Sequence, residues 1–375
     1  MTKRNDKKTV PELRFRGFTD PWEQRQLGEV AEVSTGGRNT QDGIDNGKYP
    51  FFVRSQEISS IDQFDYDETA ILVPGDGRIG EIFHLYSGKY ALHQRVYRVV
   101  PNQSRIVPNY LLALMQFRFR RHVLRLNAQG TVPSLRLPFF TGWEIPLPSL
   151  PEQHRIGDFF STLDSLIAAA ERQETLLRQK KQAYLQLMFP REAETEPRLR
   201  FAGFSGEWET RRFGEIFQYE RPDAYLADDD EIEDEGAIPV LTANKAFILG
   251  YTNSLQGTYR KGRCVIFDDF TLDSKRVEQP FKVRSSAIKI LTVRENKDFD
   301  FAFELLRTRK FPLLGHARHY ITVVQPQAAL IPHSLQEQQH IGRFFRNFDS
   351  LIAVAEKQTA SLCTLKSAYL QRMFV

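Results

Sequence analysis

Residues 152–189 read EQHRIGDFFSTLDSLIAAAERQETLLRQKKQAYLQLMF, and the chain contains this stretch twice. The second copy, residues 337–374, reads EQQHIGRFFRNFDSLIAVAEKQTASLCTLKSAYLQRMF and is identical at 22 of 38 positions without a gap. Apolar residues recur in both copies at alternating steps of three and four, which predicts a long helix with one apolar seam. An apolar seam must be buried against another apolar surface, and we expect that surface to be the other copy.

The predicted seam consists of apolar and aromatic side chains at matching places in the two copies. It comprises Ile156, Phe159, Leu163, Leu166, Leu177 and Tyr184 in the first copy and Ile341, Phe344, Phe348, Leu351, Leu362 and Tyr369 in the second. Gln173 and Gln358 interrupt it, and polar residues at such positions fix the register of a helix pair at some cost in stability. At ~1.5 Å per residue, each helix is roughly 55 Å long. An ordinary core helix is the alternative interpretation.

A second repeat shows that the whole chain is duplicated. Residues 11–30 read PELRFRGFTDPWEQRQLGEV and residues 197–216 read PRLRFAGFSGEWETRRFGEI, with 11 of 20 positions identical. The chain therefore consists of two tandem units, each a globular part followed by a long helix. The predicted domains are 1–150, with repeat segment 11–30; spacer helix 151–189; 190–334, with repeat segment 197–216; and spacer helix 335–375.

The segments between the repeats, 31–146 and 217–331, share length but little sequence. Strands are predicted at Phe51–Arg54, Ala70–Val73, Ile82–Tyr86, Gln94–Val99, Ile238–Thr242, Gly262–Phe267 and Ala287–Val293. Each segment also carries one predicted helix, near Asn109–Leu126 and Phe299–Arg309. The expected fold class is α+β, with two β-rich domains separated by a long two-helix coiled coil. A repeated scaffold that holds unlike inserts predicts two similar folds, each of which recognises something different.

Composition limits the classes of protein that the chain can belong to. The net charge of +4 is compatible with nucleic-acid binding without requiring it. Two cysteines exclude a disulfide framework and indicate a reducing compartment. No apolar run approaches the ~18 residues of a membrane span, and the charged N-terminus does not resemble a signal peptide. These features predict a cytoplasmic protein.

Motifs for catalysis or metal binding are missing from the sequence. Gly75-Asp-Gly-Arg-Ile-Gly80 matches a dinucleotide-binding pattern, but a strand rather than a helix is expected to follow it. A tight loop that presents Arg78 is therefore the favoured interpretation. His316 and His319 form a close histidine pair without a supporting cysteine or carboxylate cluster, so no metal site is predicted. With no nucleophile elbow or phosphate-binding loop, we expect a binding protein without catalytic residues.

Basic and polar side chains at predicted turns are the candidate DNA contacts, because they pair with phosphates and purine edges. They are Arg54, Gln56, Arg78, His93, Arg95, Arg118, Arg121, Gln129 and Thr131 in the first unit, and Thr242, Asn244, Lys245, Lys275, Arg276, Arg284, His316, Arg318, His319 and Tyr320 in the second. The acidic run 228–235 is expected to be a solvated loop directed away from DNA. For each residue, a solvated loop or helix end is the alternative.

Together these features resemble the specificity subunit of type I restriction-modification systems. The resemblance is carried by the two repeats and by the phrases LPSLPEQHRIGDFF (147–160), HSLQEQQHIGRFF (333–345), NAQGTVPSLR (127–136) and GHARHYIT (315–322). It implies two target-recognition domains that each read one half of a bipartite DNA sequence. It also implies that the long helices pack antiparallel between these domains and set the gap between the half-sites.

The same resemblance implies that other chains perform the chemistry. Two methyltransferase subunits would methylate adenine N6 with S-adenosylmethionine, and translocase-nuclease subunits would use ATP and magnesium. No cofactor is expected on this chain itself. A coiled-coil adaptor without sequence-specific DNA binding is the alternative, and it predicts no salt-dependent DNA affinity. A self-sufficient nuclease is a further alternative, which predicts DNA cleavage by the purified chain with magnesium alone.

Overall fold

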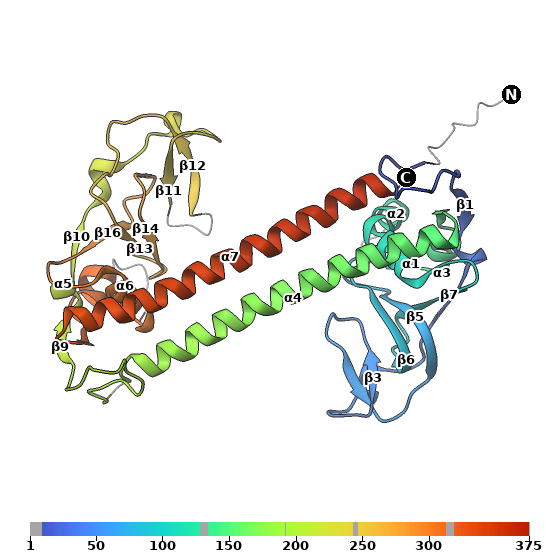
Figure 1. Ribbon diagram of the computed structural model, residues 1–375, viewed down its shortest axis with the longest axis horizontal. Helices are drawn as coiled ribbons and strands as arrows, with labels where there is room; N and C mark the ends of the chain where they lie inside the picture. Colours follow the sequence, from blue (N-terminus) through green and yellow to red (C-terminus); the bar gives the residue numbers. More distant parts are fainter. Residues whose placement is uncertain (1–9, 128–133, 192, 243–246, 313–318, 375) are drawn as a thin grey trace. The chain divides into compact units, whose positions relative to one another are not determined.

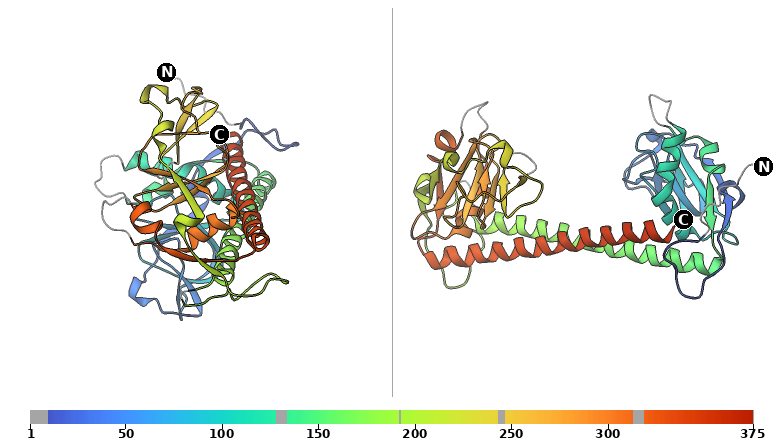
Figure 2. Two further views of the ribbon diagram at one scale, coloured as in Figure 1. Left: turned by 90° about the vertical axis from the view of Figure 1, so that its left-hand side faces the viewer. Right: turned by 90° about the horizontal axis from the view of Figure 1, so that it is seen from above.

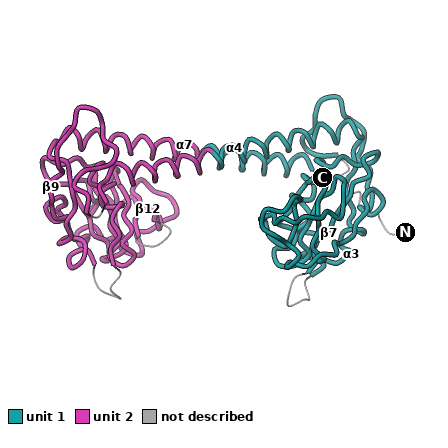
Figure 3. Tube along the Cα trace, turned by 90° about the horizontal axis from the view of Figure 1, so that it is seen from below, with its two compact units in different colours: residues 1–172, 356–375 teal, residues 173–355 magenta. Residues whose placement is uncertain are grey.

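The computed structural model describes residues 10–127, 134–191, 193–242, 247–312 and 319–374. The chain divides into two compact units (Figure 3). The first contains residues 1–172 and 356–375, and the second contains residues 173–355. Each unit therefore holds one globular part together with a portion of both long helices.

The two predicted long helices are present as α4 (Leu150–Met188) and α7 (Leu335–Met373), each 39 residues long. They pack antiparallel, and in each unit their portions lie side by side (Figure 1). In the first unit the rings of Phe159 and Tyr369 are 5.0 Å apart, and in the second those of Tyr184 and Phe344 are 5.1 Å apart. The predicted pairing of the two copies is confirmed. No helix among the described residues is long and apolar enough to span a membrane.

The observed seam differs in part from the predicted one. Ile156, Leu163 and Ile341 are buried as expected, but the leucines at positions 166 and 351 are 50% and 53% exposed. Each helix packs against a globular part as well as against the other helix, so the buried stripe is displaced from an ideal two-helix seam. Its remaining apolar members are Phe160, Ala170, Phe345, Ile352 and Ala355, all of which are buried. Leu177 and Leu362 are half-buried.

The first unit is built on a six-stranded sheet in the order β2-β7-β5-β6-β3-β4. Its strands are β1 (Glu23–Gln26), β2 (Ala31–Thr35), β3 (Tyr49–Phe52), β4 (Ser59–Ile61), β5 (Tyr66–Pro74), β6 (His84–Leu92), β7 (Val96–Pro101) and β8 (Glu144–Leu147). Its helical elements are η1 (Leu27–Glu29), η2 (Thr40–Asp42), α1 (Pro108–Leu114), the π-helical η3 (Met115–Phe119), α2 (Arg120–Leu126) and α3 (Leu137–Thr141). Strands β1 and β8 pair separately from this sheet, at the two ends of the insert.

The second unit has a different sheet arrangement, with one sheet in the order β10-β16-β13-β14 and another in the order β12-β11-β15. Its strands are β9 (Glu209–Arg212), β10 (Phe217–Glu220), β11 (Ile238–Leu241), β12 (Ile248–Thr252), β13 (Cys264–Asp268), β14 (Ser274–Val277), β15 (Lys282–Val283), β16 (Ile288–Val293) and β17 (Ala328–Ile331). Its helical elements are α5 (Phe213–Ile216), η4 (Pro222–Tyr225), η5 (Asp229–Glu231), α6 (Phe299–Thr308) and the π-helical η6 (Tyr320–Val324). Strands β9 and β17 repeat the pairing of β1 and β8. The predicted α+β class with unlike inserts is confirmed.

The repeated sequence at the start of each long helix makes the same contacts in both units. Glu152 accepts two hydrogen bonds from the Arg14 guanidinium, at 2.6 and 2.7 Å, and is almost completely buried. Glu337 binds Arg200 in the same way, at 2.7 and 2.8 Å. Such two-pronged pairs fix orientation as well as position. The arginine of each short repeat therefore ties its segment to the following long helix.

The glycine of the same motif permits close packing of the globular part on the helix. A Cβ at Gly157 would lie 2.8 Å from the backbone nitrogen of Tyr110. A Cβ at Gly342 would lie 2.2 Å from a carboxylate oxygen of Asp298, the N-cap of α6. Only glycine leaves room for these approaches.

The far end of each long helix completes the core of the other helix's globular part. Leu370, Met373 and Phe374, at the end of α7, belong to the core of the first unit, and this end of α7 lies beside that unit's globular part (Figure 2). Met188 and Phe189, at the end of α4, belong to the core of the second unit. Each core is thus closed by the beginning of one helix and the end of the other.

A lysine near the end of each helix makes a second repeated contact. In the second unit the Lys181 ammonium lies 2.8 Å from Glu304 of α6 and 2.6 Å from Asp349 of α7. In the first unit Lys366 pairs with Asp164 and lies 2.8 Å from the amide oxygen of Gln116. The second unit therefore places a buried carboxylate where the first has a neutral amide.

We predict that Lys181→Met destabilises the second unit by about 3–5 kcal/mol, because the fully buried Glu304 loses its nearest cation. Denaturant unfolding measures the change, with exposed Lys180→Met as the matched control. Adding Glu304→Gln to Lys181→Met should recover much of the loss, since no buried charge is then left unpaired. An unfolding midpoint unchanged by Lys181→Met alone would contradict this prediction.

Candidate nucleic-acid interface

Two candidate arginines in the first unit converge on one carboxylate. Arg54 follows β3 and Arg95 precedes β7, and each guanidinium lies 3.3 Å from the same carboxylate oxygen of Asp76. Both arginine side chains are at least half exposed. Ion pairs in such surroundings are worth ~0–1 kcal/mol, so a phosphate or a base edge can displace Asp76 at little cost. Gln56 is exposed in the same loop as Arg54.

The glycine-rich segment after β5 is a tight loop, as predicted, and the described chain continues into turns and then β6. Gly77 and Gly80 have positive φ angles of 75° and 66°, which glycine adopts without strain. Arg78 extends from the loop with its side chain 71% exposed and pairs with Glu81 at 2.8 Å. The geometry presents a cation at the surface and provides no helix N-terminus for a pyrophosphate.

His93 occupies a supporting position and does not face solvent, contrary to its prediction as a DNA contact. Its side chain is buried, and burial lowers its pKa, with the nearby Arg54 charge lowering it further. Its Nδ1 accepts a hydrogen bond from the Arg95 backbone N–H at 3.0 Å. The neutral ring therefore holds the backbone from which Arg95 projects.

The candidates Arg118 and Arg121 lie close together, in η3 and α2, with Arg125 one turn further along α2. Arg121 and Arg125 are exposed, whereas Arg118 in η3 is half-buried. Burial lowers the pKa of Arg118, and the charges of Arg121 and Arg125 lower it further. These three guanidinium groups repel one another. Binding of a polyanion at α2 would neutralise their charges, and the reduced repulsion would favour binding.

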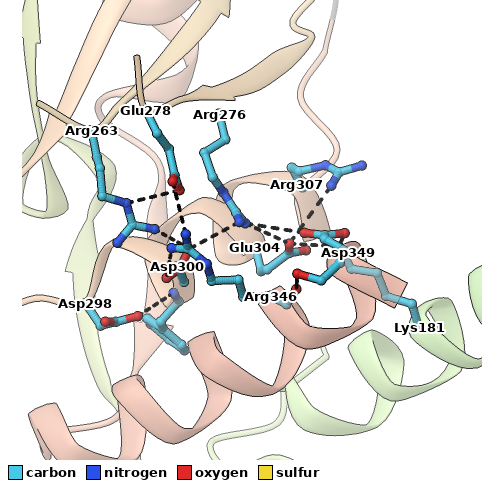
Figure 4. Close-up of polar contacts among 12 residues, drawn as sticks. Lys181, Arg263, Arg276, Glu278, Asp298, Asp300, Glu304, Arg307, Arg346 and Asp349 are labelled. Carbon is cyan, nitrogen blue, oxygen red and sulfur yellow. Dashed lines mark hydrogen bonds and ion pairs between the residues drawn. The ribbon is translucent and has the colours of Figure 1, made fainter. Parts of the chain in front are cut away.

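Arg276 in the second unit was predicted to contact DNA, but the structure places it in a buried ionic network (Figure 4). Its guanidinium lies 3.3 Å from Asp300, 3.4 Å from Asp349 and 3.7 Å from Glu304, and only 15% of the side chain is exposed. The alternating pattern of β14 turns this side chain toward α6 and α7, away from solvent. Arg276 therefore connects the sheet of the insert to α6 and to the long helix α7.

The network continues along the same face of α6. Arg263 lies 2.7 Å from Asp300 and also pairs with Glu278, and Arg346 of α7 pairs with the same two carboxylates. Burial raises the pKa of Glu304, which the Lys181 charge opposes. Ion pairs between alternating basic and acidic side chains thus attach the second insert to α7.

Three further candidates in the second unit are buried. His319 and Tyr320 have no exposed surface, because they begin the π-helical turn η6 that packs into the core. The Tyr320 backbone N–H and the His319 ring both bind Asp269, at 2.7 Å each. Thr242, at the end of β11, is also buried.

Lys275 and Arg284 remain partly exposed on the second insert. Lys275 lies 4.6 Å from the ring centre of Phe247 and 3.5 Å from Asp273. Arg284 lies 2.5 Å from Asp229, a member of the acidic run. Glu231, in the same run, pairs with buried Lys282. Most of the acidic run is exposed, and Asp229 and Glu231 tie it to the insert through these two pairs.

The remaining candidates, Gln129, Thr131, Asn244, Lys245, His316 and Arg318, lie outside the described residues. Sequence reasoning missed Asp76, which organises two of the predicted arginines. Asp76 lies between two glycines after a buried strand, and this position could have indicated a carboxylate in an exposed turn. Within the described ranges no group of three His, Cys, Asp or Glu residues could hold a metal ion.

Comparison with known proteins connects this arrangement to one family. Residues 19–178 match the family described as the type I restriction modification DNA specificity domain. The specificity subunit of the type I restriction enzyme EcoR124I/EcoR124II from Escherichia coli is 37% identical over 179 residues. That alignment covers 44% of this chain and 43% of the relative, so the chain matches less than half the length of that protein.

Two further similarities extend over nearly the whole chain. The putative type I restriction enzyme MjaX specificity subunit from Methanocaldococcus jannaschii is 24% identical over 383 residues, covering 90% of this chain and 89% of the relative. The crystal structure of the type I restriction-modification S subunit from M. genitalium superposes with a TM-score of 0.75 at 16% identity, covering 98% of this chain and 99% of that one. Residues 19–178 are thus similar to the DNA specificity domain of type I restriction-modification systems, and the chain as a whole shares the fold of an S subunit.

Proposed function

We propose that this chain is the non-catalytic DNA-sequence reader of a type I restriction-modification complex. Each insert reads one half of a bipartite target, and the paired helices set the unread gap between the halves. The observation that carries the proposal is the contrast between scaffold and insert. The two units share their framing strands and helix anchors, whereas their inserts differ in strand order.

Exposed cations supply the chemistry for such reading. Arg54, Arg78, Arg95 and Arg121 are available in the first unit, and Lys275 and Arg284 are partly available in the second. Arginine forms paired hydrogen bonds with guanine edges and with phosphates. The carboxylates that hold several of these side chains in free protein orient them and can be exchanged for DNA acceptors.

Docking of the methyltransferase subunits would use the exposed apolar residues on the long helices. Leu166 and Leu351 occupy equivalent positions of the repeat, one in each unit, and each is about half exposed. Two equivalent apolar sites suit two copies of a partner. In this proposal the methyltransferase subunits bring S-adenosylmethionine, and the restriction subunits bring ATP and magnesium.

Exchange of residues 31–146 for the corresponding insert of another specificity subunit should change only one half of the methylated sequence. The reason is that the six-stranded sheet and its loops belong to the first unit alone. Mapping of methylated adenines in cells that carry the chimera measures the outcome. A change in both halves would contradict independent reading, and the parental chain is the control.

Insertion of four residues after Ala170, matched by four after Ala355, should lengthen the gap and leave both half-sites unchanged. Four helical residues add ~6 Å, which corresponds to about one to two base pairs at 3.4 Å each. The same methylation map reads the gap directly. Insertion of four residues into the linker before Pro197 is the control and should leave the gap as it was.

Replacement of both exposed leucines, Leu166→Asp with Leu351→Asp, should prevent assembly with the methyltransferase subunits while the chain stays folded. Both side chains are half exposed, so the charges enter solvent in the free chain but would be buried in a complex. Co-purification measures assembly and circular dichroism measures folding. The matched control is Thr162→Asp with Asn347→Asp, at exposed positions on the same helices. Intact assembly of the leucine variant would contradict docking at these positions.

A further inference from the structure

An open pocket of about 630 Å³ in the second unit is lined by four basic side chains. It lies between the end of α4 and the chain that follows α6. Arg191 borders it on one side and Arg307, Arg309 and Lys310 on the other. None of the described residues that line the pocket carries a carboxylate, although acidic residues are nearly as numerous as basic ones in the chain, at 47 against 51.

The backbone of the scaffold fixes the positions of these cations. Phe189 is buried in the core directly after α4, so the following turn carries Arg191 to the rim of the pocket. Helix α6 ends at Thr308, which brings Arg309 and Lys310 to the opposite side. The Arg307 guanidinium lies over the ring of Phe303, 5.4 Å from its centre. The cations are therefore held near one another by buried residues.

Two carboxylates near these cations are engaged elsewhere. Glu194 accepts a hydrogen bond from the Arg191 backbone N–H at 3.0 Å and pairs with Arg198 at 2.6 Å. Glu304 lies 4.0 Å from Arg307, but it lies only 2.8 Å from Lys181 and 3.7 Å from Arg276. Its single charge is thus shared among three cations and leaves the pocket with an excess of positive charge. Gln182, Gln186 and Gln327 add amide donors to the lining. Guanidinium forks, an ammonium group and amide donors together match the oxygens of a phosphate.

We propose that this pocket binds phosphate groups, either those of a DNA backbone or those of a free polyphosphate. Its lining includes no residue of the insert strands β10–β16, and therefore it is separate from Lys275 and Arg284. A contact here would add affinity without reading sequence, since phosphates are the same at every base pair. The DNA form of this inference rests on the proposed function.

The test variant is Arg191→Gln with Lys310→Gln in the full chain, because both side chains are exposed. If the pocket holds DNA phosphates, the slope of log affinity against log salt for a duplex of about 30 base pairs should fall by about two, equally for every sequence. If it holds a free polyphosphate, calorimetry with tripolyphosphate should show binding by the wild-type chain that the variant loses. The charge-matched control is Lys297→Gln with Arg343→Gln, outside the lining and near the other end of α6.

An unchanged salt slope in the variant, together with no tripolyphosphate binding by the wild-type chain, would overturn the pocket as a phosphate site and leave DNA reading by the inserts intact. Equal losses in the test and control variants would overturn it as well, because they would show a general charge effect. If the wild-type chain binds no duplex at all, the proposed function fails, and the tripolyphosphate titration alone decides the pocket.

Discussion

Closure of each globular core by two helix segments from distant parts of the chain is the constraint on which the structure depends. The first unit uses the beginning of α4 and the end of α7, and the second uses the beginning of α7 and the end of α4. Bidentate arginine–carboxylate pairs lock the beginnings, at Glu152 and Glu337. Neither helix can leave one globular part without opening its core, so the antiparallel pairing and the folding of the inserts are coupled.

The two units differ in how their inserts are fastened to this scaffold. In the second unit, Arg276 on β14 reaches Asp300, Glu304 and Asp349, and thereby joins the sheet to both α6 and α7. In the first unit Lys366, the counterpart of Lys181, donates a hydrogen bond to Gln116, and Phe117 stacks on Phe374. Lys275, a candidate DNA contact, is the direct neighbour of Arg276, so the position of β14 depends on α6 and α7.

The repeat and the helix pairing could be predicted from the sequence because they rest on periodic patterns and on identity between copies. The long helices, the α+β class and the unlike inserts followed from these patterns. The orientation of individual side chains did not follow. Arg276, His319 and Tyr320 are residue types that often contact DNA. The pleat of β14 directs Arg276 inward, and the π-helical turn η6 buries His319 and Tyr320. Leu166 and Leu351 fit a two-helix seam, yet packing against a third element rotated the buried stripe away from them.

The dependence of the first core on Leu370, Met373 and Phe374 has a consequence for synthesis on the ribosome. Domains made first ordinarily fold first, as soon as they leave the exit tunnel. Here the amino-terminal globule lacks part of its apolar interior until residues 370–374 have been translated. The second globule, by contrast, receives Met188 and Phe189 before its own strands are made. Of the two globular parts, the one that is translated first is therefore the last whose interior is completed.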